Sequence, residues 1–226
     1  MGNSSNERYV LLTDYDTDSA YSAAYYTLFA NIRLNWESAS TQQHTLLLTT
    51  PTAHAEQAAA VANVAIAAAQ SGIPTILMDA DLRTPGLQQR FGLAKGPGLS
   101  DLLAEESISP QKIPNYLQST FVPGLQVLGA GTSPAKGALL LLSPKLKEVV
   151  SSICQYQAAS ETQPGIVIFH SPPVLAGPDA SLIGALVEQT FLSIIVGHTT
   201  RAQAKQAQEQ LERAHAKLAG IIMLNA

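Results

Sequence analysis

Short, continuously apolar runs alternate along the chain with longer stretches that favour helix. Strands that are apolar at consecutive positions are typical of a parallel sheet that is covered on both faces. We therefore predict an α/β fold, a mostly parallel sheet flanked by helices on both faces in three layers. The predicted strands are residues 45–49, 75–78, 125–128, 166–169, 190–196 and 220–224, and the predicted helices are residues 18–35, 54–71, 86–91, 99–104, 136–156, 180–187 and 201–218.

The chain shows neither an internal repeat nor a low-complexity linker, so a single domain is the simplest organisation. We assign residues 1–17 to a polar N-terminal segment and residues 18–226 to the domain. The most continuous small-apolar run, Ala58–Ala69, is much shorter than the about 18–20 residues that a membrane-spanning helix needs. We expect a cytoplasmic protein, with any link to the inner membrane made through a partner.

Charge and cysteine content narrow the classes of partner and compartment. The formal net charge is −4 and the chain has no Lys/Arg-rich run, so the electrostatic footprint of a nucleic-acid-binding protein is missing. The same absence argues against a partitioning-type ATPase that acts on DNA. The single cysteine, Cys154, cannot form an intramolecular disulfide and fits a reducing compartment.

Polar segments follow three of the predicted strands. In parallel sheets of this kind, ligands bind beyond the carboxyl ends of the strands. We therefore expect residues 49–59, 79–83 and 170–173 to meet in one crevice.

Residues 77–85, LMDADLRTP, form an apolar run followed by the pattern Asp-x-Asp-Leu-Arg-x-Pro. This pattern resembles a Walker motif of the bacterial tyrosine kinases of capsule and exopolysaccharide synthesis. The resemblance covers nearly the whole chain and implies a fold of the P-loop NTPase type. It continues through residues 91–93, 98–103, 131–143, 172–175, 179–180 and 220–225.

The phosphate-binding loop of that family, Gly-Glu-Gly-Lys-Ser-Thr, is replaced in this chain. Counted back from Asn63, the matching residues are His54-Ala55-Glu56-Gln57-Ala58-Ala59. Glycine lets the backbone wrap closely around phosphate, whereas Glu56 brings a negative charge to that position. Gln57 replaces the lysine that offsets phosphate charge, and Ala58 replaces the hydroxyl that would hold Mg²⁺. The resemblance therefore predicts a degenerate loop formed by Ala55, Glu56, Gln57, Ala58 and Ala59.

The metal side of the expected site is altered as well. The family's Asp-Thr-Pro-Pro is here His170-Ser171-Pro172-Pro173, and a neutral imidazole is a poor ligand for Mg²⁺. Asp79 and Asp81 are retained, either as residual catalytic or metal contacts or as solvated carboxylates inherited with the fold. Asp79, Asp81 and His170 together could hold a transition metal, or His170 could be a hydrogen-bonded substitute for the lost carboxylate.

Two further polar residues have two interpretations each. Arg83 pairs either with one of the neighbouring carboxylates, Asp79 or Asp81, or with a phosphate. Asn225 matches the position that contacts the nucleotide base in the family, and it equally fits a polar residue near the end of the chain.

The charged pattern Glu-x-x-Arg-x-x-Arg, through which the family's N-terminal helices pair in a ring, is also missing. The matching residues are Ala23, Tyr26 and Phe29. Either this surface forms a different interface, or Tyr26 and Phe29 pack on their own domain. The family's tyrosine-rich C-terminal tail has no counterpart in this sequence.

These replacements lead to two hypotheses about function. The first is a pseudokinase, a binding or regulatory module in polysaccharide synthesis or export that needs no cofactor. Its expected partners are a membrane chain-length-determinant protein or an active kinase homologue. The alternative is a divergent ATP-dependent tyrosine kinase or ATPase that retains weak activity with ATP or ADP and Mg²⁺.

Overall fold

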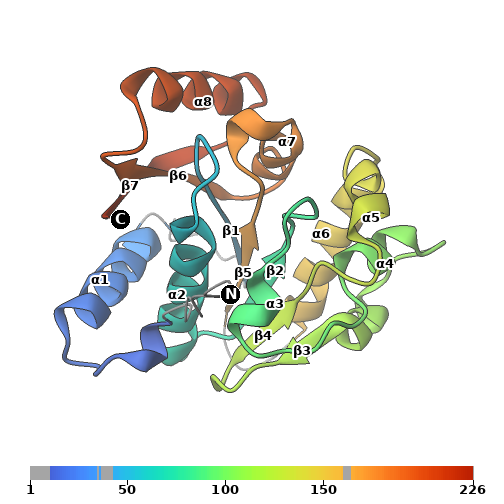
Figure 1. Ribbon diagram of the computed structural model, residues 1–226. Coiled ribbons are helices and arrows are strands. Elements are labelled where there is room, and N and C mark those ends of the chain that lie inside the picture. The colour runs from blue at the N-terminus through green and yellow to red at the C-terminus, as the bar shows by residue number, and fades with distance from the viewer. Residues whose placement is uncertain (1–10, 35, 37–42, 160–163, 226) are drawn as a thin grey trace, which may run out of the picture.

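The computed structural model describes residues 11–34, 36, 43–159 and 164–225. A seven-stranded sheet runs through the molecule in the order β3-β4-β2-β5-β1-β6-β7 (Figure 1). All neighbouring strands are parallel except β3, which pairs antiparallel with β4 at one edge. The strands are β1 (Gln43–Thr49), β2 (Thr75–Asp79), β3 (Leu117–Ser119), β4 (Leu125–Leu128), β5 (Gly165–His170), β6 (Gln189–Val196) and β7 (Leu218–Asn225). The mostly parallel sheet expected from the sequence is therefore confirmed.

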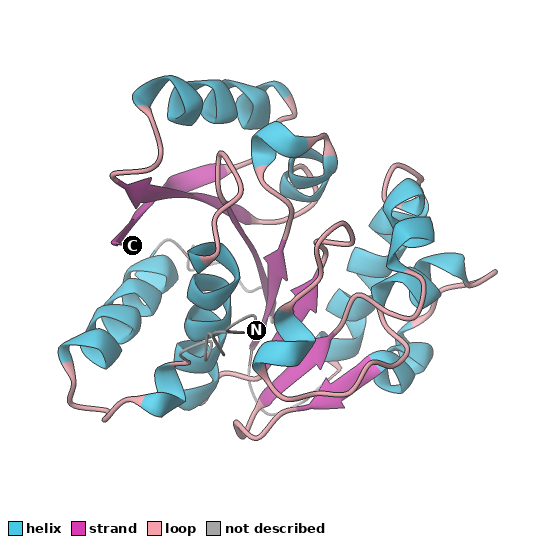
Figure 2. Ribbon diagram, in the orientation of Figure 1, coloured by secondary structure: helices cyan, strands magenta, loops and turns pink. Residues whose placement is uncertain are grey.

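Helices cover both faces of this sheet, as the cyan ribbons around the magenta strands show (Figure 2). The described α-helices are α1 (Ala20–Leu34), α2 (Glu56–Gln70), α3 (Leu87–Arg90), α4 (Leu99–Ala104), α5 (Pro134–Leu140), α6 (Lys145–Ala158), α7 (Asp179–Gly184) and α8 (Arg201–Arg213). Short 3-10 helices lie at Leu12–Asp14, Pro110–Tyr116 and Val174–Ala176.

Alternate side chains of the central strands supply two separate cores. On β1, Leu46 and Leu48 belong to the core formed with α1 and α2, whereas Leu47 belongs to the core formed with α4 and α6. This division follows from the strand period of two, which sends successive side chains to opposite faces. The arrangement accounts for the continuous apolar runs in the sequence.

The Ala-rich helix α2 lies at the centre of the first core, where most of its residues are buried. Small side chains let the helix approach the sheet closely, and alanine has the highest intrinsic helix propensity. Gly72, at φ 84°, takes the left-handed conformation that ends the helix, and its N–H bonds to the carbonyl of Ala69. The chain then enters β2 directly, so α2 fixes the spacing between the loops at the ends of β1 and β2.

The structure corrects several predicted boundaries. The predicted helix 136–156 is two helices, α5 and α6, because Pro144 has no N–H and begins a new helix instead of continuing the first. The predicted helix 201–218 ends at Arg213, and His215, at φ 60°, turns the chain into β7. Strand β3 was not predicted, since three residues are too few for a recognisable pattern.

The N-terminal part of the described chain is also less separate than its composition suggests. Residues 1–10 of the predicted polar segment lie outside the described residues, but Leu11 and Leu12 are buried in the core with α1 and α2. The backbone N–H of Leu12 donates to Oδ1 of Asn63 on α2 at 2.8 Å. The packed domain therefore begins before residue 18.

Helix α1 packs on its own domain through two of the residues that replace the family's charged motif. Phe29 is buried in the core, and the hydroxyl of Tyr26 donates to Oε1 of Gln70 at 2.8 Å. Ala23 is exposed. Of the two alternatives for this surface, the structure therefore supports intramolecular packing.

Candidate functional site

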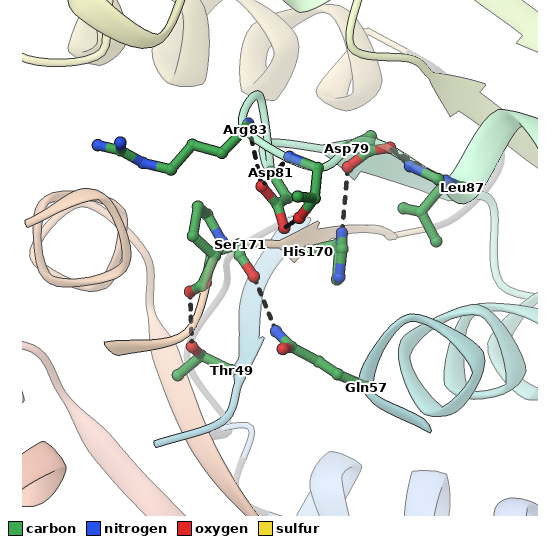
Figure 3. Close-up of polar contacts among 11 residues, drawn as sticks. Thr49, Gln57, Asp79, Asp81, Arg83, Leu87, His170 and Ser171 are labelled. Carbon is green, nitrogen blue, oxygen red and sulfur yellow. Dashed lines mark hydrogen bonds and ion pairs between the residues drawn. The ribbon is translucent and has the colours of Figure 1, made fainter. Parts of the chain in front are cut away.

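The three segments expected to converge do meet beyond the carboxyl ends of the central strands (Figure 3). In the sheet register, His170 at the end of β5 lies between Leu48 on β1 and Asp79 on β2. The loops that follow β1 and β5 are joined by backbone hydrogen bonds: the N–H of Val174 donates to the carbonyl of Thr50 at 2.8 Å, and that of Leu175 to Pro51 at 3.1 Å. The loops that were expected to line a crevice are therefore hydrogen-bonded to one another.

Gln57, which replaces the expected lysine, is part of this connection. Its side chain is only 5% exposed. Its Nε2 donates to the carbonyl of Ser171 at 2.7 Å, while its Oε1 accepts from the hydroxyl of Thr50 at 2.7 Å. Both polar ends of the amide are thus satisfied within the protein. A lysine could donate to Ser171 but could not accept from Thr50, so glutamine suits this bridge.

The turn before α2 satisfies its own N–H groups through His54. The carbonyl of His54 accepts from the N–H of Gln57 at 3.2 Å, and its ring Nδ1 accepts from the N–H of Glu56 at 3.4 Å. The ring of His54 also lies 4.8 Å from that of His198, which follows β6. In a phosphate-binding loop such N–H groups face the ligand. Here two of them are directed to His54, while the Glu56 side chain is exposed.

Asp79 and His170 form a buried pair at the ends of β2 and β5. Oδ1 of Asp79 lies 3.1 Å from Nδ1 of His170. Oδ2 of Asp79 accepts from the backbone N–H groups of Gly86 and Leu87, each at 3.0 Å. Both carboxylate oxygens are therefore engaged inside the protein, and the pair agrees with a hydrogen-bonded histidine in place of a carboxylate.

Asp81 turns away from this pair and caps its own loop. Its Oδ1 accepts from the N–H groups of Arg83 and Thr84 at 3.1 and 2.9 Å, and its Oδ2 accepts from the Thr84 hydroxyl at 2.7 Å. Among the described residues, no group of three or more His, Cys, Asp and Glu side chains is placed to hold a metal ion. Of the residues considered for a metal site, Asp79 is bonded to His170, whereas Asp81 is bonded to Arg83 and Thr84.

Arg83 pairs with a residue that the sequence did not suggest. Its Nε donates to Oδ2 of Asp179, the first residue of α7, at 2.7 Å. The hydrogen bond and the charge of Asp179 raise the pKa of Arg83 above its usual value. The expected pairing of this side chain with Asp79 or Asp81 is corrected, since only the Arg83 backbone contacts Asp81. Asn225 is exposed at the end of β7 and lines a groove beside α1.

Replacing Arg83 by alanine is expected to lower the free energy of unfolding by about 2 kcal/mol. The Asp179 side chain is 2% exposed and would lose its ion-pair partner, whereas Arg83 is 48% exposed, which makes the effect smaller than for a fully buried pair. Urea denaturation measures the change. Arg201→Ala, which removes the same charge from an exposed position on α8, is the matched control. Equal stabilities of the two variants would show that the pair contributes nothing.

Sequence reasoning missed three residues at the site: Thr50, Asp179 and His198. Thr50 had the character of an ordinary loop threonine, and only its contact with Gln57 distinguishes it. Asp179 and His198 reach the site through the loops after β5 and β6, and no local pattern marks a contact that depends on strand order. For Asp179, the available indication was that Pro172-Pro173 and Asp179-Ala180 both match the family's sequence pattern.

Comparisons with known proteins agree with this architecture. No family model matches the chain. Tyrosine-protein kinase YwqD of Bacillus subtilis is 34% identical over 197 residues, which are 86% of this chain and 78% of YwqD. Putative tyrosine-protein kinase EpsB of Ralstonia solanacearum is 29% identical over 177 residues, which are 78% of this chain but only 22% of EpsB. EpsB thus extends far beyond the part that is alike.

Solved structures extend the agreement to three dimensions. The BceF tyrosine kinase domain matches with a TM-score of 0.79 and 28% identity, over 96% of this chain and 81% of that one. The chimerical protein CapA2B2 matches with a TM-score of 0.79 and 25% identity, over 95% of this chain and 88% of CapA2B2. MinD of Pyrococcus horikoshii shares the P-loop NTPase fold alone. It matches with a TM-score of 0.64 and 17% identity, over 80% of this chain and 70% of MinD. The sheet order, the converging loops and the extent of identity with YwqD together place this chain in the bacterial tyrosine-kinase family.

Proposed function

We propose that this chain is a tyrosine-kinase-like domain without useful phosphoryl-transfer activity, which acts as a binding or regulatory module. The observation that carries the proposal is the buried amide of Gln57, which connects Thr50 to Ser171. The corresponding lysine of a phosphate-binding loop reaches the β- and γ-phosphates. Gln57 has no positive charge to offer, and its polar atoms are already bonded within the protein.

The residues present do not fit ATP with Mg²⁺. Ala58 has no hydroxyl for the metal ion, and His170 offers nitrogen where Mg²⁺ prefers oxygen. Each lost electrostatic contact typically costs about 2.7–4 kcal/mol in the transition state. Two such losses correspond to at least about 10⁴-fold in rate. We therefore derive no catalytic step through a nucleotide at this site.

We further propose that the module serves capsule or exopolysaccharide synthesis or export. Membership of the tyrosine-kinase family supports this setting, and the partner would be a membrane chain-length-determinant protein or an active kinase homologue. In the described part of the chain, none of the helices has the length and apolar character needed to cross a bilayer. An attachment through a partner is compatible with that finding.

Calorimetric titration of the protein with ATP and Mg²⁺ tests the proposal. Nucleotide that binds the folded state would stabilise it by mass action and raise the melting temperature. We expect neither such a rise nor saturable heat at micromolar protein. Phosphate release should not exceed that of Asp81→Ala. Micromolar binding would contradict the proposal, and phosphate release that disappears in Asp81→Ala would establish the alternative, a divergent ATP-dependent kinase or ATPase.

A further inference from the structure

Strand β7 forms an edge of the sheet as far as the structure describes it, and its sequence lacks the residues that usually protect an edge. In the described part of the chain, it pairs only with β6. Its sequence, LAGIIMLN, contains neither a charged residue nor proline. Monomeric proteins usually protect an edge strand with lysine, proline, a bulge or a covering element, because its free N–H and C=O groups can pair with another chain. A register irregularity at Ala219 leaves Gly220–Asn225 regularly paired with β6.

Large apolar side chains are exposed on this strand. Ile221 is 57% exposed and Met223 is 63% exposed, and both point to the same face of the sheet. Val196 at the end of β6, which pairs with Asn225 on the same face, is also exposed. Contiguous exposed apolar surface of this kind is typical of an interaction site.

A groove of about 450 Å³ runs between β7 and α1, which lie next to each other near the C-terminus (Figure 1). It is lined on α1 by side chains that include Tyr25 and Leu28, and on β7 by residues 221–225. Every residue that lines it is uncharged. An occupant that is itself uncharged and extended would match this surface, whereas a buried charge would find no partner in it.

We propose that two copies of this chain pair antiparallel through β7. The chain itself supplies an uncharged, extended segment that, among the described residues, pairs along one edge only. A two-fold contact places such a surface against itself. A charged side chain near such an axis would lie close to the same charge on the second copy and be repelled by it. Because β7 and the groove carry no charged residue, this surface is compatible with its own copy.

The geometry of this pairing can be stated further. An antiparallel pair centred on Ile222 sets Ile221 opposite Met223 of the second copy and joins the two sheets into one. The two-fold axis is then perpendicular to the sheet, so the two α1 helices lie on the same face and close the groove between them. This contact differs from one through the positions of Ala23, Tyr26 and Phe29, because Phe29 is buried and Tyr26 is bonded to Gln70.

Sedimentation of the full chain over a wide micromolar range tests the proposal. We expect a dimer whose dissociation constant rises at least about tenfold in Met223→Lys, since a lysine on an edge strand blocks pairing. Leu139→Lys is the matched control, because Leu139 is 74% exposed on α5, away from β7. That variant should dimerise like the native chain.

Hydrogen exchange of the native chain gives a second measurement that needs no substitution. The amides of Gly220–Asn225 should exchange more slowly as the concentration rises, while those of the short edge strand β3 should not change. If Met223→Lys does not fold, Ile221→Lys and this measurement decide the question. A native chain that stays monomeric throughout, a dimer that Met223→Lys leaves intact, or protection of β7 that appears only with a different protein would overturn the proposal.

Discussion

Restoring the phosphate-binding loop is expected to raise the affinity for ATP with Mg²⁺ by at least about a thousandfold, or ~4 kcal/mol. The variant carries His54→Gly, Glu56→Gly, Gln57→Lys and Ala58→Ser. Most of the gain should come from Gln57→Lys, because a cation would replace a neutral amide beside the phosphates. The Glu56 side chain is exposed, so water screens part of its repulsion and its removal should contribute less.

The same substitutions release the N–H of residue 56, which the ring of His54 now engages. The carbonyl and ring of His54 accept from Gln57 and Glu56, and a glycine at position 54 would remove the ring and permit a closer wrap. Adding His170→Asp should improve Mg²⁺ binding in this background but not in the native loop. In the native loop, that change would only place a second carboxylate beside Asp79, where like charges disfavour each other.

Calorimetry on matched proteins checks this expectation. Gln208→Lys adds the same charge by the same substitution on the outer helix α8, where the Gln208 side chain donates to Glu212. Gln208→Lys should leave nucleotide affinity unchanged. A gain in the restored loop would then be due to contacts at the loop and not to the change in net charge. If the native chain and the restored loop bound ATP equally well, the substitutions in the loop would not be what limits binding.

The fold of this chain could be predicted largely because its central strands are apolar on both faces. Runs such as Leu46–Leu48 and Ile166–Phe169 are typical of a parallel sheet that is covered on both faces, and the order of strands and helices then brings the loops together. The convergence of Gln57, Asp79 and Ser171 follows from that topology. The element boundaries were less accurate where one residue decides them, as at Pro144 and His215.

The internal bonds of the crevice could not be predicted from the sequence. Glutamine at position 57, where the family has lysine, indicates the loss of a charge. It does not indicate that the new amide connects Thr50 to Ser171. Likewise, the sequence around Arg83 offers two nearby carboxylates, and the ion pair with Asp179 forms because α7 begins within reach of the Arg83 side chain. Such contacts depend on side-chain directions that only the packed structure determines.

Taken together, the replaced residues Gln57 and His170 and the retained Arg83 act as a set of internal connections. Gln57 connects the loops after β1 and β5, His170 connects β5 to Asp79 on β2, and Arg83 connects the loop after β2 to α7. In an active site, polar groups of this kind would be directed to ligand and metal. Here they satisfy one another, which favours a stable domain over one that must change partners during a reaction cycle.

His170→Ala is expected to lower the free energy of unfolding by about 3 kcal/mol. The Asp79 side chain is buried and would keep its bonds to the Gly86 and Leu87 N–H groups, but Oδ1 would lose its partner. Loss of the imidazole also leaves a cavity beside it, which adds to the cost. The midpoint of urea denaturation measures the effect, and His198→Ala, at an exposed position, should change stability by no more than about 0.5 kcal/mol.

A double-mutant cycle separates the pair from the cavity. Asp79→Asn removes the buried charge, so His170→Ala should cost less in that background, with a coupling between the two positions of at least about 1.5 kcal/mol. His170→Asn should recover part of the loss, because its side-chain amide can donate to the same carboxylate oxygen. If the cost of His170→Ala were the same with aspartate and with asparagine at position 79, the imidazole would act by filling space alone. The Asp79–His170 bond would then contribute nothing to holding the ends of β2 and β5 together.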